Sequence, residues 1–397
     1  MNARNDRIAG VAVGLAAGDA LGAGYEFGPA FDGPVSMIGG GPFGWEPGEW
    51  TDDTQMAICI AEQAATGHLD LDALGDRFIA WSEEANDIGN QTRAVLSQAI
   101  LGADLPAVAA ARFHQHPRHS AGNGSLMRTG PIALPYLGDR DRIAEAATAI
   151  SALTHADPLA IDACVLWSIA VGEAVETGEI PEIRIGLDCV PPDRRDRWRE
   201  FVNEAEAQPP GLFTPNGFVV TAFQAAWSSI THTPVPADRP ARHLQTTLEN
   251  AVRIGHDTDT VAAIAGTLLG AIWGASAVPD EWQETLHGWP GYRVHDLKRL
   301  AEQAAANTGQ NTMPSPDNAP SKNTMPDGQS DQEQPDKEEQ ALPTGPARQS
   351  HQAYRDRKSK TRVKDMPKDV QKERYRALTG LEPTDAELEM ALDLNLL

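Results

Sequence analysis

The chain has 397 residues and a formal net charge of -23, and this length suits one large core with an appendage, or two domains. The negative charge argues against nonspecific binding to nucleic acids or anionic membranes and favours a metal-dependent or small-molecule role. The three cysteines lack the Cys-x-x-Cys spacing of a zinc knuckle and do not suggest a disulfide scaffold, which is consistent with a reducing cytoplasm.

The N-terminal stretch up to Gly22 is predicted to be a helix of the mature protein rather than a secretion signal. Its apolar run is interrupted early by Asp19, and Gly14, Gly18 and Gly22 recur at four-residue spacing. Small residues at that spacing share one helix face and allow close packing against a neighbour. We therefore expect a cytoplasmic protein, in which no segment reaches the length of a membrane span.

Two acidic clusters stand at the starts of predicted apolar helices. The first, in the stretch EWTDDTQM, contains Thr51, Asp52 and Asp53. The second, in the stretch RIGHDTDT, contains Asp257, Asp259 and Thr260 and precedes a helix with almost no polar face. An ordinary helix N-cap would explain one carboxylate in either cluster, because a Thr or Asp side chain there accepts bonds from free backbone N–H groups.

Both clusters together indicate more than capping. A helix without a polar face must be buried, and unpaired charge at its start would then have to protonate or bind a cation. Asp and Thr oxygens suit Mg2+, Mn2+ or Ca2+, whereas zinc sites more often use His and Cys. The sequence therefore predicts a metal site shared by the two clusters.

The rest of the body also shows helical rather than two-residue periodicity. Ala-rich apolar stretches alternate with short connections that contain Gly or Pro, and the clearest stretches cover residues 72–85, 142–156, 160–178 and 219–230. Strictly alternating segments rich in Val, Ile and Thr are scarce, so a sheet-based architecture is a poor second choice. We expect a compact all-α domain over residues 1–303.

The composition changes sharply after this domain. Residues 304–352 are rich in Pro, Gln, Asn, Asp and Ser and are predicted to be a disordered linker, because they cannot bury a core. Residues 353–397 begin with a basic stretch and end with a Leu-rich one, which favours a short helical tail. This tail is either a docking element for a partner or a solvated amphipathic segment.

Two further groups of polar residues follow predicted helices. Glu26 stands just beyond the N-terminal helix, where a surface glutamate would be the ordinary interpretation. Asp87 and Asn90, in the stretch DIGN, lie three residues apart and would share a helical turn or an Asx-type loop. The alternative is that one of them caps the helix that begins near Gln91.

A loop of small residues precedes another predicted helix in the stretch GNGSLMR. Free backbone N–H groups of Gly122, Asn123, Gly124 and Ser125, together with the helix dipole, would suit an anion such as a pyrophosphate. Glycine-rich loops are common, and the nearby Arg128 adds little to this signal. The loop is therefore a weak indication of phosphate binding when taken alone.

In their order along the chain, these motifs resemble those of the ADP-ribosylglycohydrolase family, also called the dinitrogenase-reductase-activating glycohydrolase family. The matching stretches are GDALGAGYEF, WTDDTQM, DIGN, GNGSLMR, THADP and GHDTDT, and they cover most of the body. The resemblance implies a compact orthogonal helical bundle with a binuclear Mg2+ or Mn2+ centre. It also implies cleavage of the glycosidic bond that joins ADP-ribose to an acceptor.

The resemblance also implies a role for individual residues. It gives as metal ligands Thr51, Asp52, Asp53, Asp257, Asp259 and Thr260. Glu26 aligns with a glutamate on a mobile loop, Asp87 and Asn90 with residues that contact ribose, and His155 with a histidine close to the substrate. The loop from Gly122 to Ser125 is similar to the family's diphosphate cradle.

A mechanism follows from these positions. Two cations can hold the vicinal ribose hydroxyls and deliver a water, while cleavage at the anomeric carbon builds oxocarbenium character that a carboxylate would stabilise. Asp87 is the candidate for that carboxylate and Glu26 for the group that moves protons, although the two roles can be exchanged. The expected substrate is an ADP-ribosylated protein, with arginine favoured as the acceptor, or a small ADP-ribose conjugate.

Three other functions use similar residues. A binding-only relative would keep the fold but lose metal ligands, and the intact acidic motifs argue against it. An immunity protein that blocks or reverses a toxin's ADP-ribosylation would use the same scaffold, with the C-terminal tail as a docking arm. A phosphohydrolase would also pair carboxylates around two metals.

Overall fold

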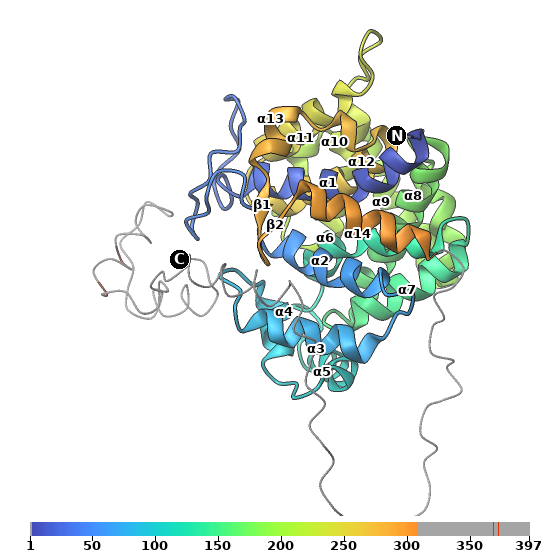
Figure 1. The fold of residues 1–397 in the computed structure, drawn as a ribbon. Helices are drawn as coiled ribbons and strands as arrows, with labels where there is room; N and C mark the ends of the chain where they lie inside the picture. The colour runs from blue at the N-terminus through green and yellow to red at the C-terminus, as the bar shows by residue number, and fades with distance from the viewer. Residues whose placement is uncertain (1, 308–367, 369–371, 373–397) are drawn as a thin grey trace, which may run out of the picture.

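The computed structural model describes residues 2–307 together with Lys368 and Lys372, and the described part is mostly helical (Figure 1). The all-α prediction is confirmed. The final long helix, α14 Val294–Ala306, runs just past residue 303, where the domain is expected to end. Almost all of the linker and tail predicted over residues 304–352 and 353–397 lies outside the described residues.

Within residues 2–307, most α-helices follow one another after short connections, but residues 23–51 form a long connection between α1 and α2, and several helices carry a 3-10 turn at one end. In chain order they are α1 Ala3–Gly22, α2 Asp52–Ala64, α3 Leu71–Ser82, α4 Asn90–Leu96, α5 Leu105–Gln115, α6 Leu126–Thr129, α7 Arg140–Ala152, α8 Pro158–Thr177, α9 Pro192–Ala207, α10 Val219–His232, α11 Arg242–Arg253, α12 Thr258–Trp273, α13 Asp280–Thr285 and α14. One short hairpin, β1 His287–Gly288 with β2 Tyr292–Arg293, precedes α14.

Two helices far apart in sequence form the centre of the core. Every residue from Ile8 to Gly22 in α1 and from Thr258 to Ile272 in α12 is buried. The two helices pack along each other, and α14 lies against α1 as well (Figure 1). This burial on all sides explains why neither central helix has a distinct polar face.

The glycine face predicted for α1 is what allows this close packing. A Cβ atom added at Gly14 would lie 2.2 Å from the carbonyl oxygen of Gly266, and one at Gly22 would lie 2.4 Å from the Cα atom of Asp259. No side chain fits at such distances, so the backbones can approach only because these positions are glycine. The contact at Gly22 brings the end of α1 to the acidic start of α12.

The helix α8 corrects one expectation from the sequence. Its 20 residues are long and apolar enough to cross a membrane by length and composition, with a mean hydropathy of 1.6, so the expectation that no segment reaches that length is wrong. However, 78% of this window is buried inside the protein, where α8 packs against α7, α10 and α12. A helix surrounded by others needs an apolar surface all round, just as a membrane helix does.

Candidate metal centre and substrate site

Asp19, which the sequence analysis treated only as an interruption of an apolar run, lies fully buried at the junction of α1 and α2. Its carboxylate accepts hydrogen bonds from the backbone N–H of Thr51 at 2.9 Å and of Thr54 at 3.0 Å, and from the Thr54 hydroxyl at 2.5 Å. Asp19 therefore serves as a cap for α2 from another helix. It also places a third acidic element beside the two predicted clusters.

Carboxylate oxygens from three helices meet at this junction. Asp19, Asp53 and Asp259 each offer one oxygen within 4.8 Å of the others, and all three residues are buried. A second group with the same spacing consists of Glu26, Asp257 and Asp259. Because Asp259 belongs to both, the structure contains two adjoining oxygen clusters, which we call the first and the second oxygen group.

The helix-cap alternative accounts for only part of the two predicted clusters: Asp259 accepts the N–H of Thr260 in the first turn of α12, but the N-cap side chains themselves do not cap. Thr51 is the N-cap residue of α2 and Asp257 that of α12, yet neither side chain bonds to a backbone N–H of the first helical turn. The Thr51 hydroxyl instead donates to Asp53 Oδ2 at 3.2 Å. The side chains of these residues thus serve the acidic site rather than the helix ends.

Only some of the predicted metal ligands lie in the two oxygen groups. Asp53, Asp257 and Asp259 lie in the oxygen groups, whereas Asp52 is buried nearby but belongs to neither group. The backbone N–H of Thr260 donates to Asp259 at 2.9 Å, while its hydroxyl contacts Met127 Sδ at 3.9 Å. The Thr260 side chain also forms a hydrogen bond with the Asp257 carboxylate, so it lies at the second oxygen group.

The electrostatics of this site are those of crowded, dehydrated carboxylates. Burial, followed by the charge of other carboxylates, raises the pKa well above its ordinary value for Glu26, Asp53, Asp87 and Asp259. Burial raises the pKa of Asp19 to about 6, and burial with repulsion from Asp19 and Asp257 raises that of Asp52 to about 7. Each carboxylate is therefore costly to ionise unless a cation lies among them.

Two oxygen atoms of these carboxylates lack a hydrogen-bond donor. Glu26 Oε2 and Asp53 Oδ1 are buried and accept no hydrogen bond from the described residues. Asp53 belongs to the first oxygen group and Glu26 to the second. Carboxylate oxygens that are buried, close together and accept no hydrogen bond fit divalent cations such as Mg2+ or Mn2+.

The segment that carries Glu26 is attached to the start of the second acidic cluster. The N–H of Phe27 donates to the carbonyl of His256 at 2.6 Å, and the N–H of His256 donates to the carbonyl of Gly28 at 2.8 Å. Phe27 and His256 both have positive φ angles, of 61° and 63°. These unusual backbone conformations turn the chain on either side so that Glu26 lies beside Asp257.

Asp87 and Asn90 differ in position although only three residues separate them. Asp87 is buried in the connection between α3 and α4, and repulsion from Asp52 and Asp257 contributes to its raised pKa. Asn90 is exposed at the first residue of α4. Gly89 is the N-cap residue of α4, so neither side chain caps this helix.

The predicted phosphate loop adjoins the second oxygen group. Asn123 donates through Nδ2 to Asp257 Oδ2 at 2.7 Å and to the carbonyl of Asn216 at 3.0 Å. The backbone N–H of Asp257 in turn donates to Asn216 Oδ1 at 2.9 Å. Asn123 and Asn216 together orient Asp257, and the sequence analysis gave no role to Asn216.

The other residues of this loop are placed differently from the expectation. The Ser125 side chain is fully buried, and its hydroxyl accepts a hydrogen bond from the Ser151 hydroxyl at 3.0 Å. The helix that follows, α6, has only four residues, so its dipole adds little to anion binding. Gly122 and Gly124 face the ring of His155, which lies in the turn between α7 and α8.

His155 is buried and neutral. Burial first, and then the charges of Arg128 and Arg112, hold the pKa of its ring well below the usual range of a histidine. The 142–156 stretch was predicted as one helical segment, but α7 ends at Ala152. His155 therefore lies in a turn beside the Gly122–Ser125 loop.

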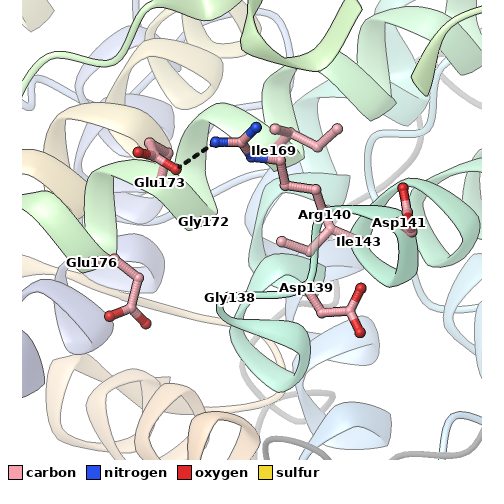
Figure 2. A pocket seen from close by; sticks show the side chains of 9 residues that line it. All are labelled: Gly138, Asp139, Arg140, Asp141, Ile143, Ile169, Gly172, Glu173 and Glu176. Atoms are coloured by element: carbon pink, nitrogen blue, oxygen red, sulfur yellow. Dashed lines mark hydrogen bonds and ion pairs between the residues drawn. The ribbon is translucent and has the colours of Figure 1, made fainter. Parts of the chain in front are cut away.

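A separate hollow lies on another part of the surface, between the start of α7 and the end of α8 (Figure 2). It has a volume of about 540 Å³, and Arg140 forms an ion pair with Glu173 across part of it at 3.5 Å. Its lining includes none of the residues predicted for the site. The convergent carboxylates, rather than this hollow, identify the candidate functional site.

Comparison with known proteins shows the family of this chain. The family model of the ADP-ribosylglycohydrolases matches residues 1–312. The chain is 28% identical to the ADP-ribosylarginine hydrolase Tri1 of Serratia proteamaculans (strain 568), over 75% of this chain and 78% of that protein. It is also 28% identical to the ADP-ribosyl-[dinitrogen reductase] glycohydrolase of Rhodospirillum rubrum, over 71% of this chain and 90% of that protein.

A solved structure shares the fold as well. It is titled ADP-ribosylglycohydrolase-related protein complex, has a TM-score of 0.60 and 27% sequence identity, and the match covers 78% of this chain and all of that chain. The matched region contains every motif on which the resemblance rests, from the stretch GDALGAGYEF to the stretch GHDTDT. The chain therefore belongs to the ADP-ribosylglycohydrolase family.

Proposed function

We propose that this protein is a metal-dependent hydrolase that cleaves the glycosidic bond between ADP-ribose and an arginine side chain. The observation that carries the proposal is the meeting of two oxygen groups at Asp259, with buried oxygens on Glu26 and Asp53 that lack donors. Arginine is the favoured acceptor because the relative from Serratia proteamaculans is named an ADP-ribosylarginine hydrolase. The substrate would be an ADP-ribosylated protein or a small ADP-ribose conjugate.

The two oxygen groups are the proposed holders of the metal. Asp19, Asp53 and Asp259 would bind one cation, and Glu26, Asp257 and Asp259 the other. When bound, Mg2+ or Mn2+ would neutralise the crowded carboxylates, polarise oxygens of the substrate and lower the pKa of a bound water. Thr51 and Asp52 lie beside these groups and would complete the coordination directly or through water.

The remaining residues would act on the sugar and its leaving group. Cleavage at the anomeric carbon develops positive charge, so a carboxylate near that carbon lowers the barrier. Asp87 suits this task because it is buried beside the acidic site without belonging to either oxygen group. Burial raises the pKa of Asp87, which also suits a group that transfers protons. Glu26 is the alternative for this task only if it is not a metal ligand.

The loop residues would hold the rest of the ligand. Asn123 keeps Asp257 in place through its amide, and the Gly122–Ser125 backbone with the neutral ring of His155 would contact the diphosphate or the adjoining ribose. Because Asn90 is exposed at the start of α4, it would contact the ribose from the solvent side. These contacts would orient the bond to be cleaved against Asp87.

Product analysis by mass spectrometry tests the proposed function. Arginine-linked and serine-linked ADP-ribosyl peptides would each be incubated with the protein and Mg2+ or Mn2+, with a chelator as the metal control. We expect release of ADP-ribose from the arginine-linked peptide only when metal is present. Release from the serine-linked peptide alone would reassign the acceptor, and cleavage of a generic phosphoester without release of ADP-ribose would identify a phosphohydrolase.

A further inference from the structure

Arg128, to which the sequence analysis gave almost no role, is a fully buried cation. It forms no ion pair with any carboxylate of residues 2–307, and its guanidinium packs 4.7 Å from the centre of the Phe78 ring. Its Nη2 donates to the Thr154 hydroxyl oxygen at 2.5 Å, and its Nη1 contacts Met56 Sδ at 3.2 Å. Burial lowers its pKa only to about 10, so it remains protonated and is purely a donor.

The Thr154 hydroxyl therefore receives one hydrogen bond and has one proton of its own to place. The side chain is fully buried, and the hydroxyl oxygen lies 2.8 Å from Nδ1 of His155. Among the described residues, His155 Nδ1 is the only acceptor within reach of this proton, because Arg128 has no lone pair. If Nδ1 carried the ring proton instead, a buried hydroxyl proton would be left without an acceptor, which is unfavourable.

This chain of donors determines which ring nitrogen of His155 carries the proton. Since the ring is neutral and Nδ1 accepts from Thr154, the proton must be on Nε2. Within residues 2–307, Nε2 forms no hydrogen bond although the residue is only 1% exposed. Nε2 therefore carries an N–H that has no hydrogen-bond partner among these residues, and Gly122 and Gly124 are the loop residues that face it.

The glycines of that loop leave space in front of Nε2. A Cβ atom added at Gly124 would lie 3.2 Å from Cε1 and 3.4 Å from Nε2 of His155, and one at Gly122 would lie 3.6 Å from Nε2. Any larger residue at Gly124 would crowd the donor edge of the ring. The two motifs GNGSLMR and THADP thus meet at this point: one supplies the glycines and Arg128, the other Thr154 and His155.

We propose that Thr154, held by Arg128, is a positioning residue that keeps His155 in the Nε2–H tautomer, so that this N–H donates to an oxygen of the ligand bound at the Gly122–Ser125 loop. The complementary ligand atom is an acceptor, either a phosphate oxygen or a hydroxyl oxygen. The identity of that ligand as ADP-ribose rests on the proposed function. The tautomer itself does not, because it follows from contacts inside the protein.

Nitrogen-15 NMR of the full-length protein labelled at histidine tests the tautomer without any assay of activity. A protonated and an unprotonated ring nitrogen resonate far apart, and the His155 signals can be assigned by their loss in His155→Gln. We expect an unprotonated Nδ1 and a protonated Nε2 in the wild-type protein at neutral pH. A proton on Nδ1 would overturn the proposal.

Two substitutions at Thr154 separate positioning from simple packing. Thr154→Val keeps the shape but removes the hydroxyl, so the Nδ1 resonance should shift and ADP-ribose affinity should fall about tenfold. Thr154→Ser restores the hydroxyl and should return the ring resonances and affinity to within about twofold of wild type. Unchanged ring resonances or undiminished affinity in Thr154→Val would each contradict the proposal.

Addition of ADP-ribose to the labelled wild-type protein tests the ligand contact. We expect the Nε2 resonance to move on binding, whereas a bound ligand that leaves Nε2 unchanged would contradict the contact. If ADP-ribose does not bind at all, the proposed function fails, while the wild-type spectrum still decides the tautomer. The two failures are therefore distinguishable.

Discussion

The carboxylate of Asp19 accepts the backbone N–H of Thr51 at 2.9 Å, which joins the end of the first helix to the start of the second. The same side chain lies in the first oxygen group with Asp53 and Asp259. Asp19 therefore has two functions that a single carboxylate can combine, since one lone pair can accept an N–H while another faces a cation. Its position also depends on the close packing of α1 against α12.

Asp19→Asn separates these two functions. The amide oxygen can still accept a hydrogen bond from Thr51, but the negative charge is lost and an NH2 group, which donates hydrogen bonds, replaces one carboxylate oxygen. We expect turnover to fall about a hundredfold and the rise in melting temperature on adding Mg2+ or Mn2+ to become much smaller. Thermal denaturation with and without metal, beside a release assay, measures both.

Asp70→Asn is the matched control for that substitution. Asp70 caps α3 by accepting from the N–H groups of Asp72 and Ala73, and it belongs to neither oxygen group. Because Asn is also a good N-cap residue, this variant should keep the activity and metal response of wild type. A normal metal response in Asp19→Asn would remove Asp19 from the metal site.

Asp259→Ala should have the larger effect because Asp259 belongs to both oxygen groups. We expect turnover to fall at least about a thousandfold and the metal-induced rise in melting temperature to disappear. Burial raises the pKa of Asp259 most, and the charges of other carboxylates raise it further. Removal of the Asp259 carboxylate therefore relieves repulsion in the metal-free protein. The metal-free melting temperature should therefore change little, which distinguishes lost metal binding from unfolding.

Asp259→Asn provides a second form of the same test without a cavity. It keeps the size of the side chain while removing the charge, so it should lose the metal response as Asp259→Ala does. If either variant retains wild-type turnover and metal response, the two-metal interpretation is wrong.

The sequence was sufficient for the helices, the glycine face of α1 and the two acidic clusters, because each has a local pattern. Periodicity and spacing along the chain reveal which residues share a helix face. The burial of Gly14 and Gly22 against α12 and the approach of Asp53 to Asp259 confirm two of these inferences. Asp19 had a usable signal, since a lone charge inside a buried helix needs a partner.

Other parts of the site depended on tertiary contacts that no local pattern shows. Asn216 holds Asp257 from a segment without helical periodicity, and only the folded chain brings the two together. The sequence analysis placed no segment at the length of a membrane span, although α8 reaches it, and the position of His155 in a turn follows from the end of α7 at Ala152. Boundaries of this kind are set by packing as well as by propensity.

The metal-free protein should become less stable as the pH rises. Asp19 and Asp52 have folded-state pKa values raised to about 6 and about 7, so the folded state holds their protons more tightly than the unfolded state does. Their contribution to stability is full below the unfolded value of about 3.9 and is lost as the pH rises through the folded values. Melting curves in chelator should therefore shift downward across this range.

Saturating Mg2+ should reduce or reverse this trend. A cation competes with protons for the same oxygens, so it binds best once the carboxylates have ionised. The matched measurement is the same pH series with metal in place of chelator. Identical pH profiles in the two series would show that these carboxylates do not bind the metal.

Truncation after residue 307 should leave a folded and active hydrolase. Leu300 and Ala304 of α14 are buried, and the Asn307 side chain donates to the carbonyl of Ala65 at 3.0 Å, so the cut must follow these residues. The region beyond is poor in large apolar residues until the tail, and we expect a melting temperature within about 2 °C of the full chain. Loss of all activity or of solubility would mean that the tail packs on the domain.

Asp87→Asn tests whether a carboxylate outside the oxygen groups acts on the rate. The substitution keeps size and hydrogen-bonding shape but removes the charge that would stabilise an oxocarbenium-like transition state, and bound ADP-ribose lacks that positive charge. Turnover should fall by about a hundredfold or more, while ADP-ribose affinity changes much less. Calorimetric titration of ADP-ribose beside a release assay provides the two numbers.

Glu26→Gln is the informative comparison, because Glu26 lies with Asp257 and Asp259 in the second oxygen group. If Glu26 is a metal ligand, its loss should weaken the metal-induced rise in melting temperature together with turnover, whereas Asp87→Asn should keep that rise. A Glu26→Gln variant with full metal response and low turnover would instead make Glu26 the group that moves protons. Equal losses of affinity and rate in both variants would make both residues substrate anchors, and the catalytic group would then have to be a metal-bound water.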